Sequence, residues 1–152
     1  IILGLGSSGF HSNGYSLVRK AISHSQLDLS SKYDEHQTWG EAILAPTKIY
    51  VKAILELMKN FDIHAMSHIT GGGITGNLPR VFPNHLAAEI KLTSLPKIKL
   101  FDWIKTTANL NDMQMFETFN CGIGYVVIVN KDDINEVTQV LQKHDINVYT
   151  LG

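Results

Sequence analysis

Two glycine-rich segments carry the residue types that bind anions. The first runs from Gly4 to Gly14 and reads Gly-Leu-Gly-Ser-Ser-Gly-Phe-His-Ser-Asn-Gly, and the second, residues 69–74, reads Ile-Thr-Gly-Gly-Gly-Ile. Each follows an apolar run and precedes a segment of helical periodicity. Because glycine reaches positive φ without a Cβ penalty, such loops turn several backbone N–H groups toward one point in front of a helix. The pattern predicts an anion at each loop, although an ordinary strand-to-helix turn is the alternative for either one.

Polar side chains surround both glycine clusters. They are those of Ser7, Ser8, His11, Asn13 and Thr70. The only two arginines, Arg19 and Arg80, each lie a few residues beyond one of the loops. Since a guanidinium grips phosphate or carboxylate at two points, they support an anionic ligand, with a surface ion pair as the alternative for each. A helix end contributes only about 0.3–1 kcal/mol to an exposed charge, so several N–H donors and an arginine must act together.

Three familiar motifs are present only in part. Residues 4–9 satisfy the dinucleotide pattern G-x-G-x-x-G. However, the turn and cap residues 11–14 delay the helix in which the third glycine of that pattern packs. Residues 71–76 lack the Lys-Ser/Thr ending of a P-loop. His64 and His68 have the spacing of zinc ligands on a helix, yet on the strand that we expect here they lie about 13 Å apart. We therefore predict no dinucleotide site, no P-loop and no metal site.

The bulk properties fit one globular domain. A chain of 152 residues with 44% apolar residues can bury one core, and its formal net charge of −1, without a basic stripe, argues against nucleic acid as a partner. No apolar run reaches the length of a membrane span, so we expect a soluble, cytoplasmic protein without membrane contact. The single cysteine, Cys121, cannot form an internal disulfide, and we interpret it as a small buried thiol rather than a nucleophile.

Hydrophobic periodicity predicts the elements that position the loops. Helices are expected at residues 15–24, 47–60, 99–107 and 112–119, as a short helix after residue 73, and from 132 or 133 through 141. Strands are expected at residues 1–3, 64–69, 85–92, 124–129 and 146–151, with 124–129 central and buried. Because the chain starts within an apolar strand, we expect a fragment whose first strand pairs with an upstream segment or a neighbouring domain. The mixture of helices and strands predicts an α+β layered sandwich with a mixed, mostly antiparallel sheet.

Five stretches occur here in the order in which one enzyme family has them. They are residues 7–19 (SSGFHSNGYSLVR), 40–52 (GEAILAPTKIYVK), 68–73 (HITGGG), 77–81 (NLPRV) and 118–122 (TFNCG). Over nearly its whole length the chain resembles the C-terminal half of aminoimidazole ribonucleotide synthetases, also called phosphoribosylformylglycinamidine cyclo-ligases. Each stretch alone would be weak, but the five together are specific.

The resemblance implies a fold, a reaction and partners. It implies that residues 1–152 form a C-terminal domain, partly ferredoxin-like, that helps to bind formylglycinamidine ribonucleotide. ATP and Mg²⁺ would sit mainly on an N-terminal domain that also forms the homodimer and is absent from this chain. The implied reaction of purine biosynthesis is an ATP-dependent ring closure, in which the formyl amide oxygen is phosphorylated, a ring nitrogen attacks and phosphate leaves. Positioning and charge neutralisation would supply most of the catalysis, and the fragment alone would be inactive.

The resemblance also suggests roles for single residues. It places His11 and Asn13 at the reacting end as catalytic candidates. The residues expected to bind the substrate or its phosphate are Ser7, Ser8, Gly9, Ser12, Gly14, Arg19, Thr70, Gly71, Gly72, Gly73, Arg80 and Asn120.

Two positions depart from the family pattern. Gly76 stands where the family usually has Glu, and Glu117 stands where it usually has Arg, so neither receives a catalytic role. Two other functions stay open. One is another ATP-dependent member of the same superfamily, such as selenophosphate synthetase or thiamin-monophosphate kinase, and the other is a non-catalytic module that binds a phosphate ligand.

Overall fold

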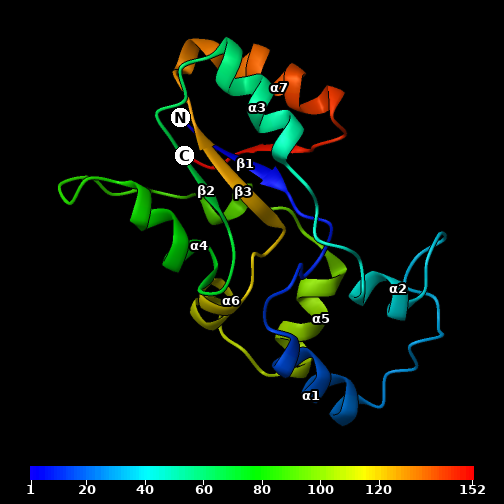
Figure 1. The fold of residues 1–152 in the computed structure, drawn as a ribbon. Helices are drawn as coiled ribbons and strands as arrows, with labels where there is room; N and C mark the ends of the chain where they lie inside the picture. Colours follow the sequence, from blue (N-terminus) through cyan, green and yellow to red (C-terminus); the bar gives the residue numbers. More distant parts are fainter.

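A four-stranded antiparallel sheet organises the computed structural model, which describes residues 1–152 (Figure 1). Its strands are β1 (Ile2–Gly6), β2 (Ala65–His68), β3 (Ile123–Ile128) and β4 (Val148–Thr150), in the order β2-β3-β1-β4. Both β1 and β2 pair antiparallel with β3, so they run in the same direction. Their carboxyl ends therefore lie at one end of the sheet, and a glycine-rich loop follows each of them.

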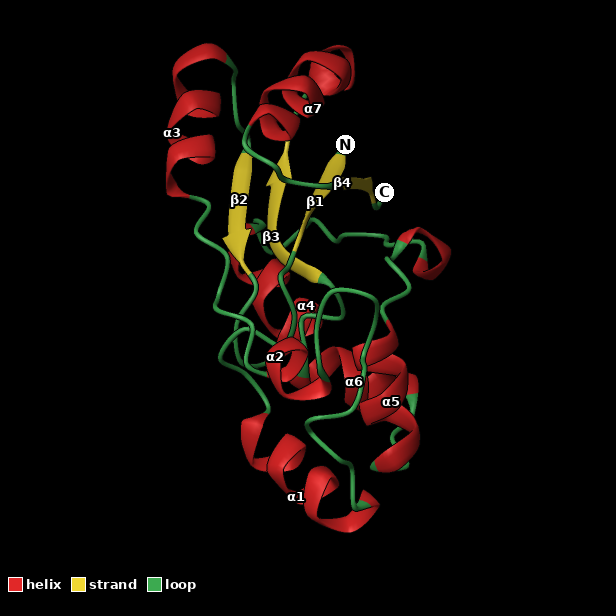
Figure 2. Ribbon diagram, turned by 90° about the vertical axis from the view of Figure 1, so that its right-hand side faces the viewer, coloured by secondary structure: helices red, strands yellow, loops and turns green.

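Two helices cover one face of this sheet: α3 (Val51–Asn60) and α7 (Ile134–Lys143). In Figures 1 and 2 they lie next to each other on the sheet. Both are amphipathic, and their apolar sides join residues of β1 and β3 in one core cluster. Each large side chain buried there contributes about 1.5–3 kcal/mol. The strand order and this helix pair are those of a ferredoxin-like arrangement, which confirms the predicted fold class.

Two insertions extend that arrangement. The chain between β1 and α3 forms α1 (Tyr15–Ser25) and α2 (Trp39–Ile43). The chain between β2 and β3 forms α4 (Gly73–Asn77), α5 (Lys99–Thr107) and α6 (Asp112–Thr118). Short 3₁₀ turns occupy Leu78–Val81, Leu92–Ser94 and Lys131–Asp133. None of the helices is long and apolar enough to span a bilayer.

The helices α1, α2, α5 and α6 form a separate lobe with its own core at the end of the sheet where β1 and β2 stop (Figure 2). Aromatic rings fill this core, and the Phe10 and Phe101 rings meet edge to face with centroids 5.3 Å apart. Residues of α4 and of the following 3₁₀ turn cover the second face of the sheet. The two glycine loops lie where this lobe joins the sheet.

Several predicted elements differ from the observed ones. Helix α3 begins at Val51 rather than at residue 47, because residues 46–50 form an irregular crossing segment, in which the Ile49 side chain is 82% exposed. No strand forms at residues 85–92, since the Lys91 N–H bond to the Leu151 carbonyl is the only backbone hydrogen bond from that run to the sheet.

The first strand also differs from its prediction. β1 lies inside the sheet between β3 and β4, so both of its partners come from this chain rather than from a neighbouring domain. It continues to Gly6, so Gly4 and Gly6 belong to the strand and not to the loop. Helix α2 was not predicted, although Thr38 and Glu41 form a capping box at its start.

Candidate functional site

The two glycine loops meet in space. We call residues 7–14 the first loop and residues 69–73 the second loop. The side-chain oxygen Oδ1 of Asn13 lies 3.7 Å from the point where a Cβ on Gly71 would sit. Both loops also pack on the end of α6: a Cβ on Gly14 would collide with the Phe119 ring, and one on Gly73 would collide with the Phe116 carbonyl. Gly14 and Gly73 have positive φ values of 73° and 57°, so glycine satisfies both the conformation and the close approach.

The meeting loops leave many backbone donors unused. Ser7 N–H bonds to the Gly122 carbonyl, and Gly73 N–H bonds to the Thr70 carbonyl. The loop N–H groups that have no acceptor in the chain are those of Gly9, Phe10, His11, Ser12, Gly14, Thr70, Gly71 and Gly72. Those of Ser12, Gly14, Gly71 and Gly72 belong to residues at or beside the contact between Asn13 and Gly71. Unpaired amides there favour an anion, because each can donate to it without giving up another bond.

His11 is buried in the first loop, with only 4% of its surface exposed. Its Nε2 accepts hydrogen bonds from the backbone N–H groups of Ser8 at 3.2 Å and Lys48 at 3.5 Å. The ring proton therefore sits on Nδ1, and this atom is the one buried side-chain nitrogen or oxygen without a partner. Burial, followed by the charges of His68 and Lys48, lowers the pKa of His11 to about 4. At neutral pH His11 is thus an uncharged donor and not an imidazolium.

Asn120 positions the first loop through buried hydrogen bonds. It is fully buried, its Nδ2 donates to the Gly9 carbonyl at 2.9 Å, and its Oδ1 accepts from the Gly122 N–H and from the Ser7 hydroxyl. The structure therefore places Asn120 and Ser7 where they position the loop. Whether either also contacts a ligand stays a prediction.

The outer side of the first loop rests on the crossing segment that leads to α3. The Ser8 hydroxyl donates to the Pro46 carbonyl, and the hydroxyls of Ser12 and Thr47 lie 3.2 Å apart. Together with the Lys48 N–H bond to His11, these contacts fix the crossing segment against the loop.

Asn77 positions the second loop, as Asn120 positions the first. Its Nδ2 lies within hydrogen-bonding distance of the carbonyls of Thr70 (3.2 Å), Gly71 (3.1 Å) and Gly73 (2.8 Å). The Thr70 hydroxyl donates to its Oδ1. Since the carbonyls turn inward to this amide, the N–H groups of Gly71 and Gly72 are left free. No role of Asn77 is predicted from the sequence, because only the folded loop brings three carbonyls around one side chain.

The two arginine side chains form no hydrogen bond with either loop. Arg19 is exposed on α1 beside a hollow that Leu29 and Ile43 also line, and Arg80 is exposed in the turn after α4. Neither forms an ion pair within the chain. Their roles as phosphate ligands stay predictions.

The Cys121 thiol is buried, and burial raises its pKa to about 12, which confirms the interpretation as a buried thiol. No group of three or more His, Cys, Asp or Glu side chains is placed to hold a metal ion.

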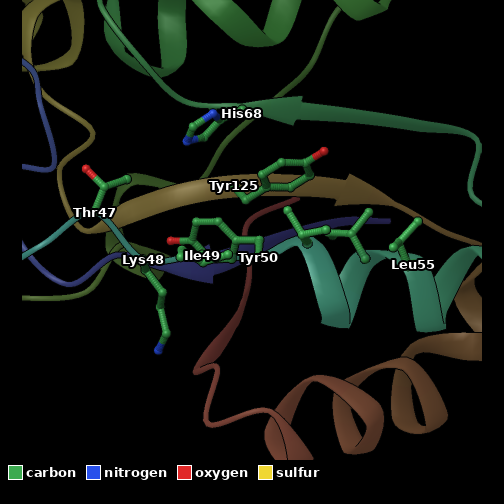
Figure 3. A pocket seen from close by; sticks show the side chains of 9 residues that line it. Thr47, Lys48, Ile49, Tyr50, Leu55, His68 and Tyr125 are labelled. Atoms are coloured by element: carbon green, nitrogen blue, oxygen red, sulfur yellow. The ribbon is translucent and has the colours of Figure 1, made fainter.

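A cleft of about 380 Å³ adjoins the site (Figure 3). The crossing segment and the start of α3 form one wall, and His68 of β2 and Tyr125 of β3 form the other. The rings of His68 and Tyr125 stack with centroids 5.8 Å apart, and the Tyr50 ring lies 5.4 Å from that of Tyr125. From the sequence, His68 is weighed only as a metal ligand and no role is predicted for Tyr50 or Tyr125, because the proximity of these three rings depends on sheet register.

Comparison with known proteins gives one consistent family. The sequence model described as "AIR synthase related protein, C-terminal domain" matches residues 1–152. Proteins named phosphoribosylformylglycinamidine cyclo-ligase are similar over the chain: one from Neisseria meningitidis serogroup C is 47% identical over 152 residues, and one from Staphylococcus aureus is 45% identical over the same length. One from Staphylococcus epidermidis is 48% identical over 151 residues. The chain is covered to 99–100% in these matches and spans 44% of the length of each relative.

Proposed function

The chain belongs to the family of AIR synthase related protein C-terminal domains, and from this premise we propose that it is the substrate-binding part of an ATP-dependent cyclo-ligase. The proposed reaction converts formylglycinamidine ribonucleotide to aminoimidazole ribonucleotide in purine biosynthesis. The similar proteins named phosphoribosylformylglycinamidine cyclo-ligase support this reaction.

One observation carries the proposal: the two glycine loops meet and present free amides together. A phosphate monoester has three terminal oxygens and accepts several short hydrogen bonds at once. The free N–H groups of Gly14, Gly71 and Gly72 fit such a group better than they fit a neutral one. We therefore assign the substrate's 5′-phosphate to the place where the loops meet.

His11 and Asn13 would act at the reacting end as neutral groups. The Asn13 carboxamide lies at the junction of the loops, where it can donate to a substrate oxygen. The Nδ1–H of His11 lacks an acceptor, and a buried donor left unpaired costs about 1–3 kcal/mol, so an acceptor supplied by the substrate would remove that cost. Because the His11 pKa is about 4, His11 would orient the substrate and would not carry a proton as a cation.

The chemistry of the proposed reaction needs a phosphoryl donor. An amide oxygen leaves poorly until it carries a phosphoryl group, so ATP would phosphorylate it, a substrate nitrogen would attack the activated carbon, and inorganic phosphate would leave. This chain has no carboxylate cluster suited to Mg²⁺. We therefore propose that ATP and Mg²⁺ are bound mainly by an N-terminal domain of the whole protein, which would also form the homodimer.

Enzyme assays test the proposal directly. The whole protein, incubated with ATP, Mg²⁺ and formylglycinamidine ribonucleotide, is expected to form aminoimidazole ribonucleotide and one phosphate per turnover. The 152-residue chain alone is expected to be inactive. Turnover of selenide or thiamin monophosphate, but not of the ribonucleotide, would move the chain to another branch of the superfamily. Turnover by the isolated chain would contradict its assignment as the substrate-binding part.

A further inference from the structure

The cleft beside the loops differs in composition from the proposed phosphate site. Its walls are mainly apolar and aromatic, with Ile49 and Leu55 on one side and His68 and Tyr125 on the other (Figure 3). Its volume of about 380 Å³ falls within the usual size range of small-molecule sites.

Both walls of the cleft are joined to the glycine loops, one by hydrogen bonds and the other along the chain. On one side, Thr47 lies in the cleft and its hydroxyl contacts that of Ser12, while the Lys48 N–H bonds to His11. On the other side, His68 ends β2 and is followed after one residue by Thr70 of the second loop. A molecule anchored where the loops meet can therefore extend into the cleft between these two segments.

Two polar side chains of the cleft, those of His68 and Tyr125, form no hydrogen bond within the chain. The Tyr50 hydroxyl, in contrast, donates to the Gly6 carbonyl. Aromatic faces together with a few free polar atoms are typical of sites for planar heterocycles. A purely apolar peptide segment would leave the polar atoms of His68 and Tyr125 without partners.

Resting on the proposed function, we propose that this cleft receives the planar, nitrogen-containing aminoimidazole ring of the product ribonucleotide, which forms by closure of the acyclic end of the substrate while the loops hold the phosphate. The ring packs against Tyr125 and His68, with the side chains of Ile49 and Leu55 opposite. The His68 imidazole and the Tyr125 hydroxyl bond to its nitrogen atoms. In this arrangement the loops select a phosphate and the cleft selects the group at the other end of the ribose.

Nuclear magnetic resonance of the 152-residue chain tests the proposal with three probes. They are ribose 5-phosphate, which has no ring, 5-aminoimidazole-4-carboxamide riboside, which has no phosphate, and the corresponding ribonucleotide, which has both. We expect both ring-bearing probes to shift the ring signals of His68 and Tyr125, and ribose 5-phosphate to leave them in place. If the riboside and ribonucleotide leave these signals unchanged, the cleft assignment is overturned, whatever happens at the loops.

A substitution adds a second readout. Tyr125→Leu keeps an apolar side chain of similar size and removes the ring, and Tyr149→Leu on β4 is the matched control outside the cleft. Tyr125→Leu is expected to weaken ribonucleotide binding by about 5- to 100-fold and to leave ribose 5-phosphate binding unchanged. Equal affinities of the wild-type chain for the ribonucleotide and ribose 5-phosphate would overturn the cleft assignment and leave the phosphate site standing. If the wild-type chain binds the two ring-bearing probes but not ribose 5-phosphate, that result counts against the proposed function and not against the cleft assignment.

Discussion

The side-chain nitrogen of Asn77 lies 2.8 Å from the carbonyl oxygen of Gly73, across the inside of the second loop. The same nitrogen reaches two further loop carbonyls, of Thr70 and Gly71. One buried amide thus orients three peptide groups, and their direction decides which way the loop's N–H groups face.

Asn77→Asp is expected to destabilise the chain by about 2–3 kcal/mol, because a carboxylate oxygen would face three carbonyl oxygens in place of a donor. Urea denaturation would measure the loss. Asn60→Asp is the matched control, since Asn60 is exposed and makes a single side-chain bond, to the Glu56 carbonyl. An Asn77 variant as stable as the Asn60 variant would show that the amide does not hold the loop.

Two glycines of α4 are expected to respond to alanine in opposite directions. Gly73→Ala places a Cβ against the Phe116 carbonyl at a positive φ, so it should cost about 1–3 kcal/mol or more. A Cβ on Gly76 meets nothing within 4 Å, so Gly76→Ala should stabilise the helix by up to about 1 kcal/mol. Thermal unfolding of both variants compares the two effects. Equal destabilisation would contradict the described packing of the loop on α6.

His11 makes stability depend on pH. Its pKa of about 4 in the folded chain lies below the ordinary value of 6.5, so the unfolded chain binds more protons between these values. The stabilisation is complete above pH 6.5 and is lost as the pH falls toward 4, by about 3 kcal/mol. Urea unfolding at pH 7 and pH 4.5 measures the difference. In His11→Asn, which tolerates the left-handed backbone, this part of the pH dependence should vanish, while the other six histidines contribute equally to both proteins.

Cys121 should be unreactive in the folded chain. With the thiol buried and its pKa raised to about 12, the folded chain should react with a thiol reagent at pH 8 at least about 100-fold more slowly than the chain in urea. Similar rates in both conditions would mean that residues 115–121 open readily or that the thiol is accessible.

Local patterns in the sequence predicted much of the fold. The apolar periodicity of α5 predicted its bounds at residues 99 and 107, and the β-branched run of β3 predicted an interior strand. Both signals are local, because one face of a helix or both faces of a central strand must be apolar. The start of α3 was misplaced because residues 47–50 are shaped by contacts with the first loop and not by helix packing.

Only part of the candidate site could be predicted from the sequence. Glycine clusters after β1 and β2 indicated two loops, but their meeting depends on both strands pairing with β3, which lies far along the chain. The same long-range pairing brings Tyr125 beside His68. Side chains that hold the loops from within, such as Asn77 and Asn120, carry no local signal of that role.

In the proposed function, the two loops together hold one phosphate. Titration of the ¹⁵N-labelled chain with ribose 5-phosphate measures this binding, with the amide signals of Gly14, Gly71 and Gly72 as reporters. We predict that all three signals move together along one binding curve, and that the Asn77→Asp variant loses the response while remaining folded. Signals of one loop that move without those of the other, or the absence of any response at millimolar ligand, would contradict the account.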